Sequence, residues 1–332
     1  MRIRHLVFQG GGVKGIAYVG AIDVLEQRGL MSDVNYVAGT SAGSITAALL
    51  AMGATSQDLD HVLRNTSFSS FMDGGGWLIG DAVRLLSHYG LYKGDAFEKW
   101  MRQQISMLTE RATGRAQPDM TFGQLRALAA QKPGVFRELY TVSTNLTRQM
   151  PEVFSAESTP DVPVYLAVRM SMSIPFFFEA VSSGGNFYVD GGVSWNYPID
   201  LFDGVIDRPV IGLPSRPILT AVANALDMRT LGFSLGTAAQ IQSERNDWTP
   251  LPVEISNMEG MVKGLFSFML NESTRLHLDK KALERTVFID NANIPTTDFD
   301  LTQQQIDLLV SNGRAATLAF LDGKAARVAS SA

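Results

Sequence analysis

Cysteine is absent from the 332-residue chain. Without thiols the protein has no disulfide, no thiolate nucleophile and no cysteine-based zinc or iron–sulfur site. No hydrophobic run reaches the ~18 residues that a membrane-spanning helix requires. The apolar run at residues 6–8 is also shorter than the roughly 7–15 residues of a secretory signal, and we expect it to form the first strand. The sequence predicts a protein that is cytoplasmic at synthesis, and it is compatible with delivery into another cell by a route without a cleavable signal.

Positive charge is in deficit, with 28 Lys and Arg against 33 Asp and Glu and a formal net charge of -5. Because the phosphate backbone selects basic surfaces, this balance argues against a nucleic-acid partner. It does not argue against a lipid surface, which a local apolar patch can contact. The fractions of hydrophobic and charged residues, 45% and 18%, are those of a globular chain with a buried core.

The first fifty residues alternate between two kinds of pattern. An apolar strand at residues 6–8 runs into a glycine-rich turn at 10–15, and apolar residues then repeat at helical spacing. A second apolar strand at 36–38 runs into another glycine-rich turn at 39–43, and a helix of small residues follows at 45–52. This order of strand, turn and helix predicts a parallel sheet covered by helices.

The rest of the chain continues the same architecture without internal repeats. We expect a final helix at 306–321 and later strands at residues 139–143, 187–189, 210–213 and 286–289. The sequence therefore predicts one sheet-centred domain with helical additions. Residues 1–205 are expected to form a catalytic core, and residues 206–332 the C-terminal part of the same domain.

Residues 39–43 read Gly-Thr-Ser-Ala-Gly and match the Gly-x-Ser-x-Gly nucleophile elbow. On a tight strand-to-helix turn, Gly39 and Gly43 would prevent clashes with neighbouring side chains. The turn would lift the hydroxyl of Ser41 out of the sheet edge and leave the following N–H groups free to hold an anion. The sequence makes Ser41 a candidate nucleophile; a glycine-rich turn with an incidental serine is the alternative.

The loop after the first strand contains Gly10, Gly11, Gly12, Lys14 and Gly15. Its glycines expose N–H groups at a helix N-terminus, where the dipole favours negative charge. In an acyl hydrolase these groups would form the oxyanion hole, and the lysine could orient the loop or attract a lipid phosphate. The spacing of the first, third and fourth glycines also fits a dinucleotide fingerprint. The acidic residue that this fingerprint needs after the next strand is missing, because that strand runs into the serine turn.

Asp190 follows the predicted strand at 187–189 and precedes Gly191 and Gly192. A carboxylate at a strand end with glycines behind it can approach a serine closely. It can accept the proton of Ser41 if burial raises the carboxyl pKa. The alternative is an ordinary Asp-Gly turn.

A Ser-His-Asp hydrolase is the competing enzyme class. Ser41, Asp190 and His277 occur in the chain order serine, acid, histidine of α/β-hydrolases. However, residues 274–280 have the pattern of a polar helix, not of a loop at a strand end. We therefore expect His277 and the other three histidines to be surface or structural residues.

Taken together, the glycine loop at 10–15, the elbow at 39–43 and Asp190-Gly191-Gly192 resemble the patatin-like phospholipase family. The Ser-Ile-Pro sequence at 173–175 and the run at 193–198, which ends in Asn-Tyr-Pro, reinforce the resemblance. It covers about the first 200 residues.

The resemblance implies a three-layer α/β/α fold with a mainly parallel central sheet and helical insertions. It implies a Ser–Asp dyad in which Ser41 attacks an ester carbonyl and Asp190 takes the proton and later activates water. N–H groups around Gly11 and Gly12 would stabilise the oxyanion. No cofactor and no metal are implied.

The predicted function is that of a lipid acyl hydrolase of the phospholipase A or lysophospholipase type. The alternatives are an esterase with a Ser-His-Asp triad, an acyltransferase that uses the same acyl-enzyme, and a lipid-binding protein without activity. The expected partners are a phospholipid or other lipid ester and, through peripheral contact, a membrane; an activating partner or ligand is left open.

Three apolar segments could provide contact with lipid. Residues 68–79 and 174–178 contain clustered aromatic residues, and we expect Phe176 to Phe178 to line an acyl pocket or the core. At 258–270 apolar residues repeat at helical spacing. This pattern predicts either a lid or lipid-facing helix or a core-facing amphipathic helix.

Overall fold

The computed structural model describes residues 2–73, 90–203, 210–213, 229–246, 252, 255–296 and 298–331. Two features of the sequence analysis lie outside these residues: part of the apolar segment at 68–79, and the boundary between the predicted core and the C-terminal part at 205–206. Within the described part of the chain, no helix is both long and apolar enough to cross a membrane.

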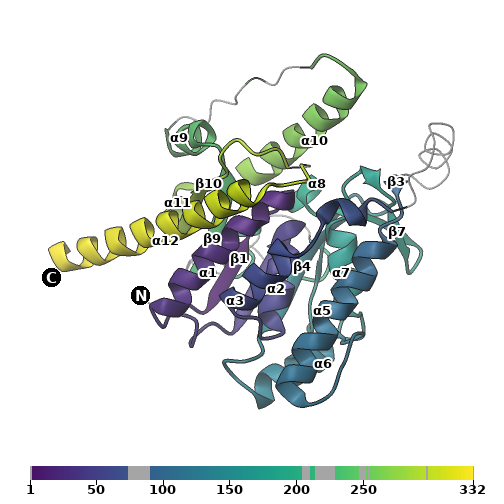
Figure 1. Ribbon diagram of the computed structural model, residues 1–332, viewed down its shortest axis with the longest axis horizontal. Coiled ribbons are helices and arrows are strands. Elements are labelled where there is room, and N and C mark those ends of the chain that lie inside the picture. Colours follow the sequence, from purple (N-terminus) through teal and green to yellow (C-terminus); the bar gives the residue numbers. More distant parts are fainter. Residues whose placement is uncertain are drawn as a thin grey trace, which may run out of the picture.

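Among the described residues, a sheet of eight strands forms the middle layer of the molecule (Figure 1). The strand order is β10-β9-β1-β2-β4-β8-β7, and β5 pairs with β4 beside this path. A small second sheet pairs β3 with β6. The strands are β1 (His5–Phe8), β2 (Tyr36–Thr40), β3 (Gly90–Tyr92), β4 (Glu138–Asn145), β5 (Met150–Phe154), β6 (Phe176–Phe178), β7 (Val181–Ser183), β8 (Asn186–Asp190), β9 (Thr230–Gly236) and β10 (Thr286–Asp290).

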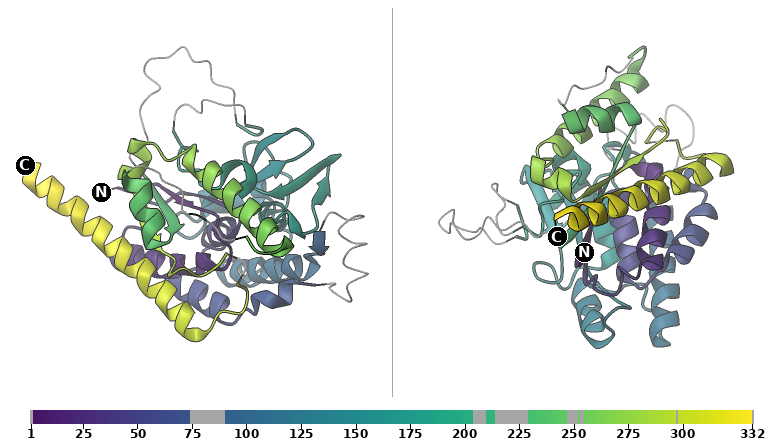
Figure 2. Two further views of the ribbon diagram at one scale, coloured as in Figure 1. Left: turned by 90° about the horizontal axis from the view of Figure 1, so that it is seen from above. Right: turned by 90° about the vertical axis from the view of Figure 1, so that its left-hand side faces the viewer.

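Helices cover both faces of this sheet, which gives the expected three-layer α/β/α fold. The helices are η1 (Gly12–Ile16), α1 (Ala17–Gln27), α2 (Ala42–Ala51), α3 (Ser56–Arg64), η2 (Phe68–Phe71), α5 (Asp95–Thr113), α6 (Phe122–Gln131), α7 (Val164–Ser171), α8 (Gly192–Trp195), α9 (Ala238–Asn246), α10 (Met258–Arg275), α11 (Lys280–Glu284) and α12 (Gln303–Ser331). Figure 2 shows that α12 continues past the body of the molecule toward the C-terminus.

The two faces of the sheet carry two separate hydrophobic cores, because successive side chains of a strand point to opposite faces. On β1, Leu6 and Phe8 belong to the larger core, which also contains buried residues of α1, α2, α3, α5, α6, α7 and α12. Val7 between them belongs to the smaller core, where it joins Trp195 of α8 and Ala282 of α11. The sheet is thus buried on both sides, as expected for parallel strands.

Strand direction divides the sheet into two parts. β10, β9, β1, β2 and β4 run parallel to their neighbours. The β4–β5, β4–β8 and β7–β8 pairs are antiparallel. The mainly parallel sheet of the sequence analysis is confirmed, and the antiparallel part was not foreseen.

Two differences from the expected strands concern the C-terminal third. β9 was not predicted, although it lies between β1 and β10 in the middle of the sheet. The strand predicted at 210–213 is wrong: Ile211 makes an isolated bridge with Glu152 and the segment pairs no further. Because β9 and β10 belong to the same sheet as β1, the residues after 206 complete the sheet that the first residues begin.

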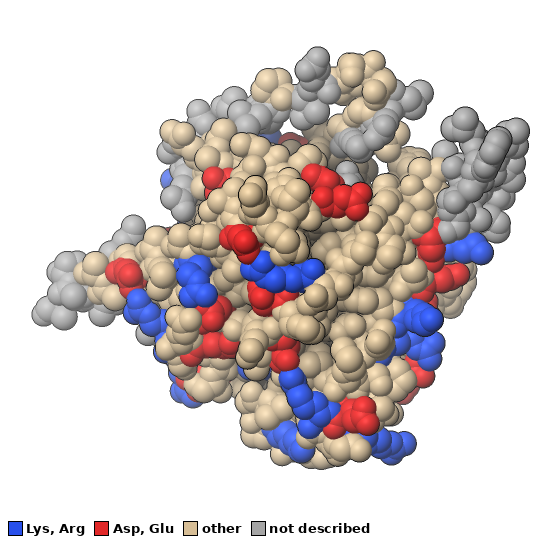
Figure 3. Space-filling model, in the orientation of Figure 1, with Lys and Arg blue, Asp and Glu red and all other residues tan. Residues whose placement is uncertain are grey.

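On the face seen in Figure 3, acidic and basic side chains are intermixed and form no broad field of one sign. This distribution agrees with the near balance of acidic and basic residues in the sequence.

Candidate active site

Ser41 lies on the tight turn between β2 and α2 and has φ 52° and ψ -128°. A positive φ is strained for a non-glycine residue and persists only where the surroundings impose it. The surroundings here are backbone: a Cβ on Gly39 would lie 2.2 Å from the carbonyl oxygen of Gly43, and a Cβ on Gly43 would lie 2.3 Å from that of Phe8. Both glycines of the motif are therefore required by close approach, which is the geometry of a nucleophile elbow.

Hydrogen bonds from outside the motif hold the strained turn. The N–H of Ser41 donates to Ser171 Oγ of α7 at 2.9 Å, and that hydroxyl donates to the carbonyl of Val142 at 2.6 Å. The hydroxyl of Ser44 donates to the carbonyl of Ser41 at 2.6 Å. The role of Ser171 could not be predicted from the sequence, because this residue lies 130 positions away from the serine that it supports.

The strand register brings Asp190 to the level of Ser41. In the sheet Thr40 pairs with Val142, and the next residue of β4, Ser143, pairs with Asp190. As a result Ser41 Oγ donates a hydrogen bond of 2.6 Å to Asp190 Oδ2. The other carboxylate oxygen accepts a hydrogen bond of 2.7 Å from the N–H of Gly192.

The carboxyl group of Asp190 has no exposed surface. Burial raises its pKa from the ordinary 3.8 to about 7, because the charged form loses its hydration, and the hydrogen bonds from Ser41 and Gly192 offset part of this effect. A carboxylate with a pKa near neutrality can accept a proton from a hydroxyl in direct contact with it. The arrangement therefore places a base of suitable strength on the serine.

The glycine loop lies beside Ser41, and its backbone N–H groups differ in whether they already have a hydrogen-bond acceptor. The N–H of Gly10 donates to the carbonyl of Asn196 at 3.0 Å, so Gly10 is not available as an oxyanion donor, contrary to the sequence expectation. Within the described part of the chain, the N–H groups of Gly11 and Gly12 have no protein acceptor. These two N–H groups are therefore not used in the hydrogen bonds of the described fold.

The other two candidate residues of the glycine loop are Lys14 and Gly15. Lys14 is partly buried and forms no ion pair with the described residues, and burial lowers its pKa to about 8. Gly15 allows η1 to pack on α2, since a Cβ there would lie 3.2 Å from the Cβ of Ala42. Gly15 thus supports the loop by packing.

An apolar cavity of about 60 Å³ opens next to Ser41. One water molecule needs roughly 10–15 Å³, so the cavity has room for a short stretch of hydrocarbon. Its apolar lining consists of Val13, Ile16, Ala42, Ile45, Leu63, Phe68, Phe71, Phe97, Met172, Ile174, Phe178 and Phe299. Of the three phenylalanines expected in a pocket or the core, Phe178 lines the cavity and Phe177 packs against the core, whereas Phe176 is 47% exposed.

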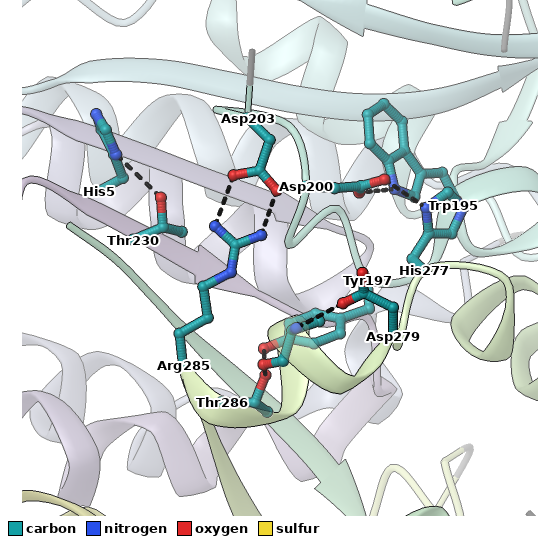
Figure 4. Close-up of polar contacts among 11 residues, drawn as sticks. His5, Trp195, Tyr197, Asp200, Asp203, Thr230, His277, Asp279, Arg285 and Thr286 are labelled. Atoms are coloured by element: carbon teal, nitrogen blue, oxygen red, sulfur yellow. Dashed lines mark hydrogen bonds and ion pairs between the residues drawn. The ribbon is translucent and has the colours of Figure 1, made fainter. Parts of the chain in front are cut away.

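His277 belongs to a different cluster, and Figure 4 shows it beside Asp200 and Trp195. Its Nδ1 contacts Asp200 Oδ2 at 2.9 Å, and its ring lies 5.3 Å from that of Trp195. Because Asp190 contacts Ser41 directly and His277 is held by Asp200, a Ser-His-Asp triad of these residues has no geometric basis. His277 is structural, as expected, but it is buried where a polar helix face was predicted.

Helix α10 has one face toward the core and another toward solvent, so it matches neither the lipid-facing nor the core-facing prediction alone. Phe266 is buried, and Leu270 reaches the active site, where a Cβ on Gly192 would lie 2.3 Å from its Cδ2. On a neighbouring stripe, three large apolar side chains are at least half exposed: Met261, Leu265 and Phe268. We call these three residues the exposed α10 stripe.

Among the described residues, no group of three or more His, Asp or Glu side chains is placed to hold a metal ion. The carboxylate of Asp190 contacts the hydroxyl of Ser41, and the neighbouring glycine loop has two backbone N–H groups without a protein acceptor in the described part of the chain. These are the parts of a site for acyl transfer through a serine.

Comparison with known proteins places this site within a family. The model of the patatin-like phospholipase family matches residues 6–203, a range that includes Ser41, Asp190 and the glycine loop. The uncharacterized protein YqhO of Bacillus subtilis (strain 168) is 33% identical over 325 residues, which are 95% of this chain and 97% of the relative. The chain therefore belongs to the patatin-like phospholipase family.

Two further proteins are similar to this chain, one in sequence and one in structure. The probable lipid hydrolase 463L of Invertebrate iridescent virus 6 is 27% identical over 203 residues, which are 60% of this chain and 62% of the relative. The crystal structure of VipD from Legionella pneumophila has a TM-score of 0.58 with 19% sequence identity. It covers 97% of this chain and 67% of that chain, so the similarity of fold extends over β9, β10 and α12.

Proposed function

We propose that this protein is a lipid acyl hydrolase of the phospholipase A or lysophospholipase type, with Ser41 as nucleophile and Asp190 as base. The observation that carries the proposal is the 2.6 Å hydrogen bond from the serine hydroxyl to a fully buried carboxylate. Membership of the patatin-like phospholipase family and the name of the viral relative support a lipid ester as substrate.

In the acylation step, Ser41 Oγ attacks the carbonyl carbon of the ester while its proton moves to Asp190 Oδ2. The carbonyl oxygen becomes an oxyanion, and the N–H groups of Gly11 and Gly12 are the donors that would stabilise it. Collapse of this intermediate breaks the bond to the alcohol. Asp190 returns its proton to the leaving oxygen, and the acyl group remains on the serine.

In the deacylation step, water takes the place of the alcohol. Asp190 accepts a proton from the water, whose oxygen attacks the carbonyl carbon of the acyl-enzyme. The bond to Ser41 Oγ breaks, and the proton on Asp190 passes to the serine oxygen. A fatty acid is released and the resting hydrogen bond between serine and aspartate is restored.

The surroundings of the site support a long-chain lipid more than a small polar ester. The cavity beside Ser41 has an apolar lining, suited to the acyl part of the substrate. Helix α10 contacts the active site through Leu270 and carries the exposed α10 stripe on its surface. Apolar side chains of this kind can bury themselves at a lipid surface, and we assign this contact to the stripe.

Release of fatty acid from mixed phospholipid vesicles tests the proposed function. Ser41→Ala and Asp190→Asn should each lower kcat by about 10⁴-fold or more. Ser155→Ala removes an equally buried hydroxyl away from the site and should keep the activity, as should His277→Ala. Normal activity of Asp190→Asn together with loss in His277→Ala would restore the triad alternative.

Two further measurements separate the remaining alternatives. A fluorophosphonate probe should label Ser41 in the folded protein, and an unlabelled serine would favour a lipid-binding protein without activity. If the probe labels Ser41 and an added alcohol receives the acyl group in preference to water, the protein is an acyltransferase. Release of free fatty acid as the main product supports hydrolysis.

A further inference from the structure

Asn196 connects three parts of the active site that are far apart in the sequence. It follows α8, six residues after Asp190, and is only 2% exposed. Its carbonyl oxygen accepts the hydrogen bond from Gly10 at 3.0 Å. Its own N–H donates to the hydroxyl of Ser273 at 2.7 Å, and its side-chain nitrogen donates to Thr274 Oγ1 at 3.0 Å. Asn196 therefore ties the glycine loop and the segment of the aspartate to α10.

The surrounding hydrogen bonds fix the orientation of the Asn196 amide. The hydroxyl of Thr274 donates to the carbonyl of Leu270 at 2.8 Å, so its oxygen is left as an acceptor. Gln9 also donates its side-chain nitrogen to this oxygen, at 3.0 Å, because the amide oxygen of Gln9 is occupied by two donors from β9. Asn196 must likewise present its nitrogen to Thr274, and its side-chain oxygen points the other way.

That oxygen, Asn196 Oδ1, is buried without a hydrogen-bond donor among the described residues. A Cβ on Gly10 would lie 2.3 Å from it, and the same Cβ would lie 3.1 Å from the Cβ of Ser41. A Cβ on Gly192 would lie 3.0 Å from it and 2.9 Å from Asp190 Oδ1. The unpaired oxygen thus lies between the backbone next to the nucleophile and the backbone next to the base.

The position of this oxygen carries a cost in stability. A buried acceptor without a donor loses its hydration without replacement, and an apolar side chain of similar shape would avoid that cost. Such groups in a folded protein call for a specific explanation. Contact with Cα–H groups on two sides, which is weakly attractive, makes the oxygen a spacer between two loops.

We propose that Asn196 is a positioning residue for the acyl-transfer reaction, which holds the glycine loop and Asp190 at a fixed spacing on the two sides of Ser41. The inference rests on the proposed function. The bond from Gly10 to Asn196 sets where the following two N–H groups point, and the side-chain oxygen keeps the loop apart from the segment of the base. An error of about 1 Å in such an arrangement can lower the rate by about 10²-fold.

The test is a steady-state comparison of Asn196→Ala with Asn145→Ala. Asn145 is an equally buried asparagine whose amide donates to Glu152, and it contacts neither Ser41 nor Asp190. We expect both variants to lose thermal stability. Only Asn196→Ala should lose activity, with kcat lowered about 10- to 100-fold and KM changed less than about 3-fold.

Variants of Thr274 supply the rescue experiment. Thr274→Ser keeps the acceptor oxygen for Asn196 and should keep kcat within about 3-fold of wild type. Thr274→Val has the same shape without that oxygen and should lower kcat at least as much as Asn196→Ala, because Gln9 loses the same acceptor. The double variant Asn196→Ala/Thr274→Val should be little slower than Thr274→Val, because the contact between the two residues is already absent in that variant.

Three outcomes overturn the inference. The first is a kcat of Asn196→Ala within about 3-fold of wild type. The second is an equal loss of kcat in Asn145→Ala, since the effect would then be general destabilisation. The third is equal activity of Thr274→Ser and Thr274→Val. If a fluorophosphonate fails to label Ser41 in wild type, the proposed function fails and the inference with it; labelling of wild type together with any of the three outcomes overturns the inference alone.

Discussion

The buried carboxyl of Asp190 predicts that its amide variant is more stable than wild type, with a gap that depends on pH. The pKa of this carboxyl is raised from 3.8 to about 7 in the folded protein. At roughly 1.4 kcal/mol per pH unit, ionising it costs the folded state about 4 kcal/mol relative to the unfolded chain. Asp190→Asn keeps a neutral group of the same shape at all pH values, so it avoids this cost.

The sign of the effect follows from the direction of the pKa change. Below pH 3.8 the carboxyl is neutral in both states of wild type and contributes no difference. Between pH 3.8 and about 7 the unfolded chain releases the proton and the folded protein retains it, so wild type loses stability as pH rises. Above about 7 both states are ionised, and the gap between wild type and Asp190→Asn is constant.

Calorimetric unfolding of wild type and Asp190→Asn from pH 4 to pH 8 measures this gap. An unfolding entropy of ~2.1 cal/mol/K per residue over 332 residues is ~0.7 kcal/mol/K, so 4 kcal/mol corresponds to about 6 °C in Tm. We expect the variant to melt about 6 °C higher at pH 8 and within about 1 °C of wild type at pH 4. A gap that is the same at both pH values would refute the reasoning.

Asp203→Asn is a control variant for which we expect the opposite change in stability. Its side chain is 13% exposed and forms an ion pair with Arg285, which is 2% exposed. Asp203→Asn removes one partner of a largely buried pair and should lower stability by about 3–5 kcal/mol. If Asp203→Asn were stabilising like Asp190→Asn, the gain at Asp190 could not be attributed to a buried charge that forms no ion pair with the described residues.

Three other predictions concern activity, folding and lipid contact. kcat/KM should rise with pH and level off above about 7, because Asp190 must be ionised to accept a proton; a limb near pH 4 would contradict this. Gly43→Ala should lower Tm, since its Cβ would lie 2.3 Å from a carbonyl of β1, whereas Gly323→Ala, with nothing within 4 Å, should not. Serine substitutions along the exposed α10 stripe should weaken sedimentation with vesicles while hydrolysis of a soluble ester persists.

The parts of the site that could be predicted from the sequence are those whose signal is local. Ser41 and the glycine loop each lie within a few residues of a strand, a turn and a helix, and the turn chemistry is visible in the glycines. The segment of Asp190 has the same kind of signal. The contact between Ser41 and Asp190 does not, because it depends on the register of β4 between β2 and β8.

β9 shows why a central strand escaped prediction. Its sequence, Thr-Leu-Gly-Phe-Ser-Leu-Gly, contains two glycines, which weaken any pattern typical of a strand. A Cβ on Gly232 would lie 1.9 Å from the hydroxyl oxygen of Tyr197. The glycine therefore serves a contact with a residue 35 positions earlier in the chain, and a local pattern cannot reveal such a contact.

The same limit applies to polar residues inside the molecule. His277 lies in a sequence with the pattern of a polar helix, but Asp200 and Trp195 bury it. Asn196 is visible in the sequence as part of Asn-Tyr-Pro, yet its three hydrogen-bond partners come from the glycine loop and α10. Burial of a polar side chain depends on its partners, and these partners are distant in the chain.

The separation of Ser41 from Asp190 has a consequence for the synthesis of the protein. The two residues are 149 positions apart, and β4 must be in place between their strands before they meet. Contacts between residues so far apart form late and slowly in folding. A chain that ends before β8 carries a serine with no base, and a partly folded chain carries both without contact. The proposed hydrolytic activity can therefore begin only after β2, β4 and β8 have paired.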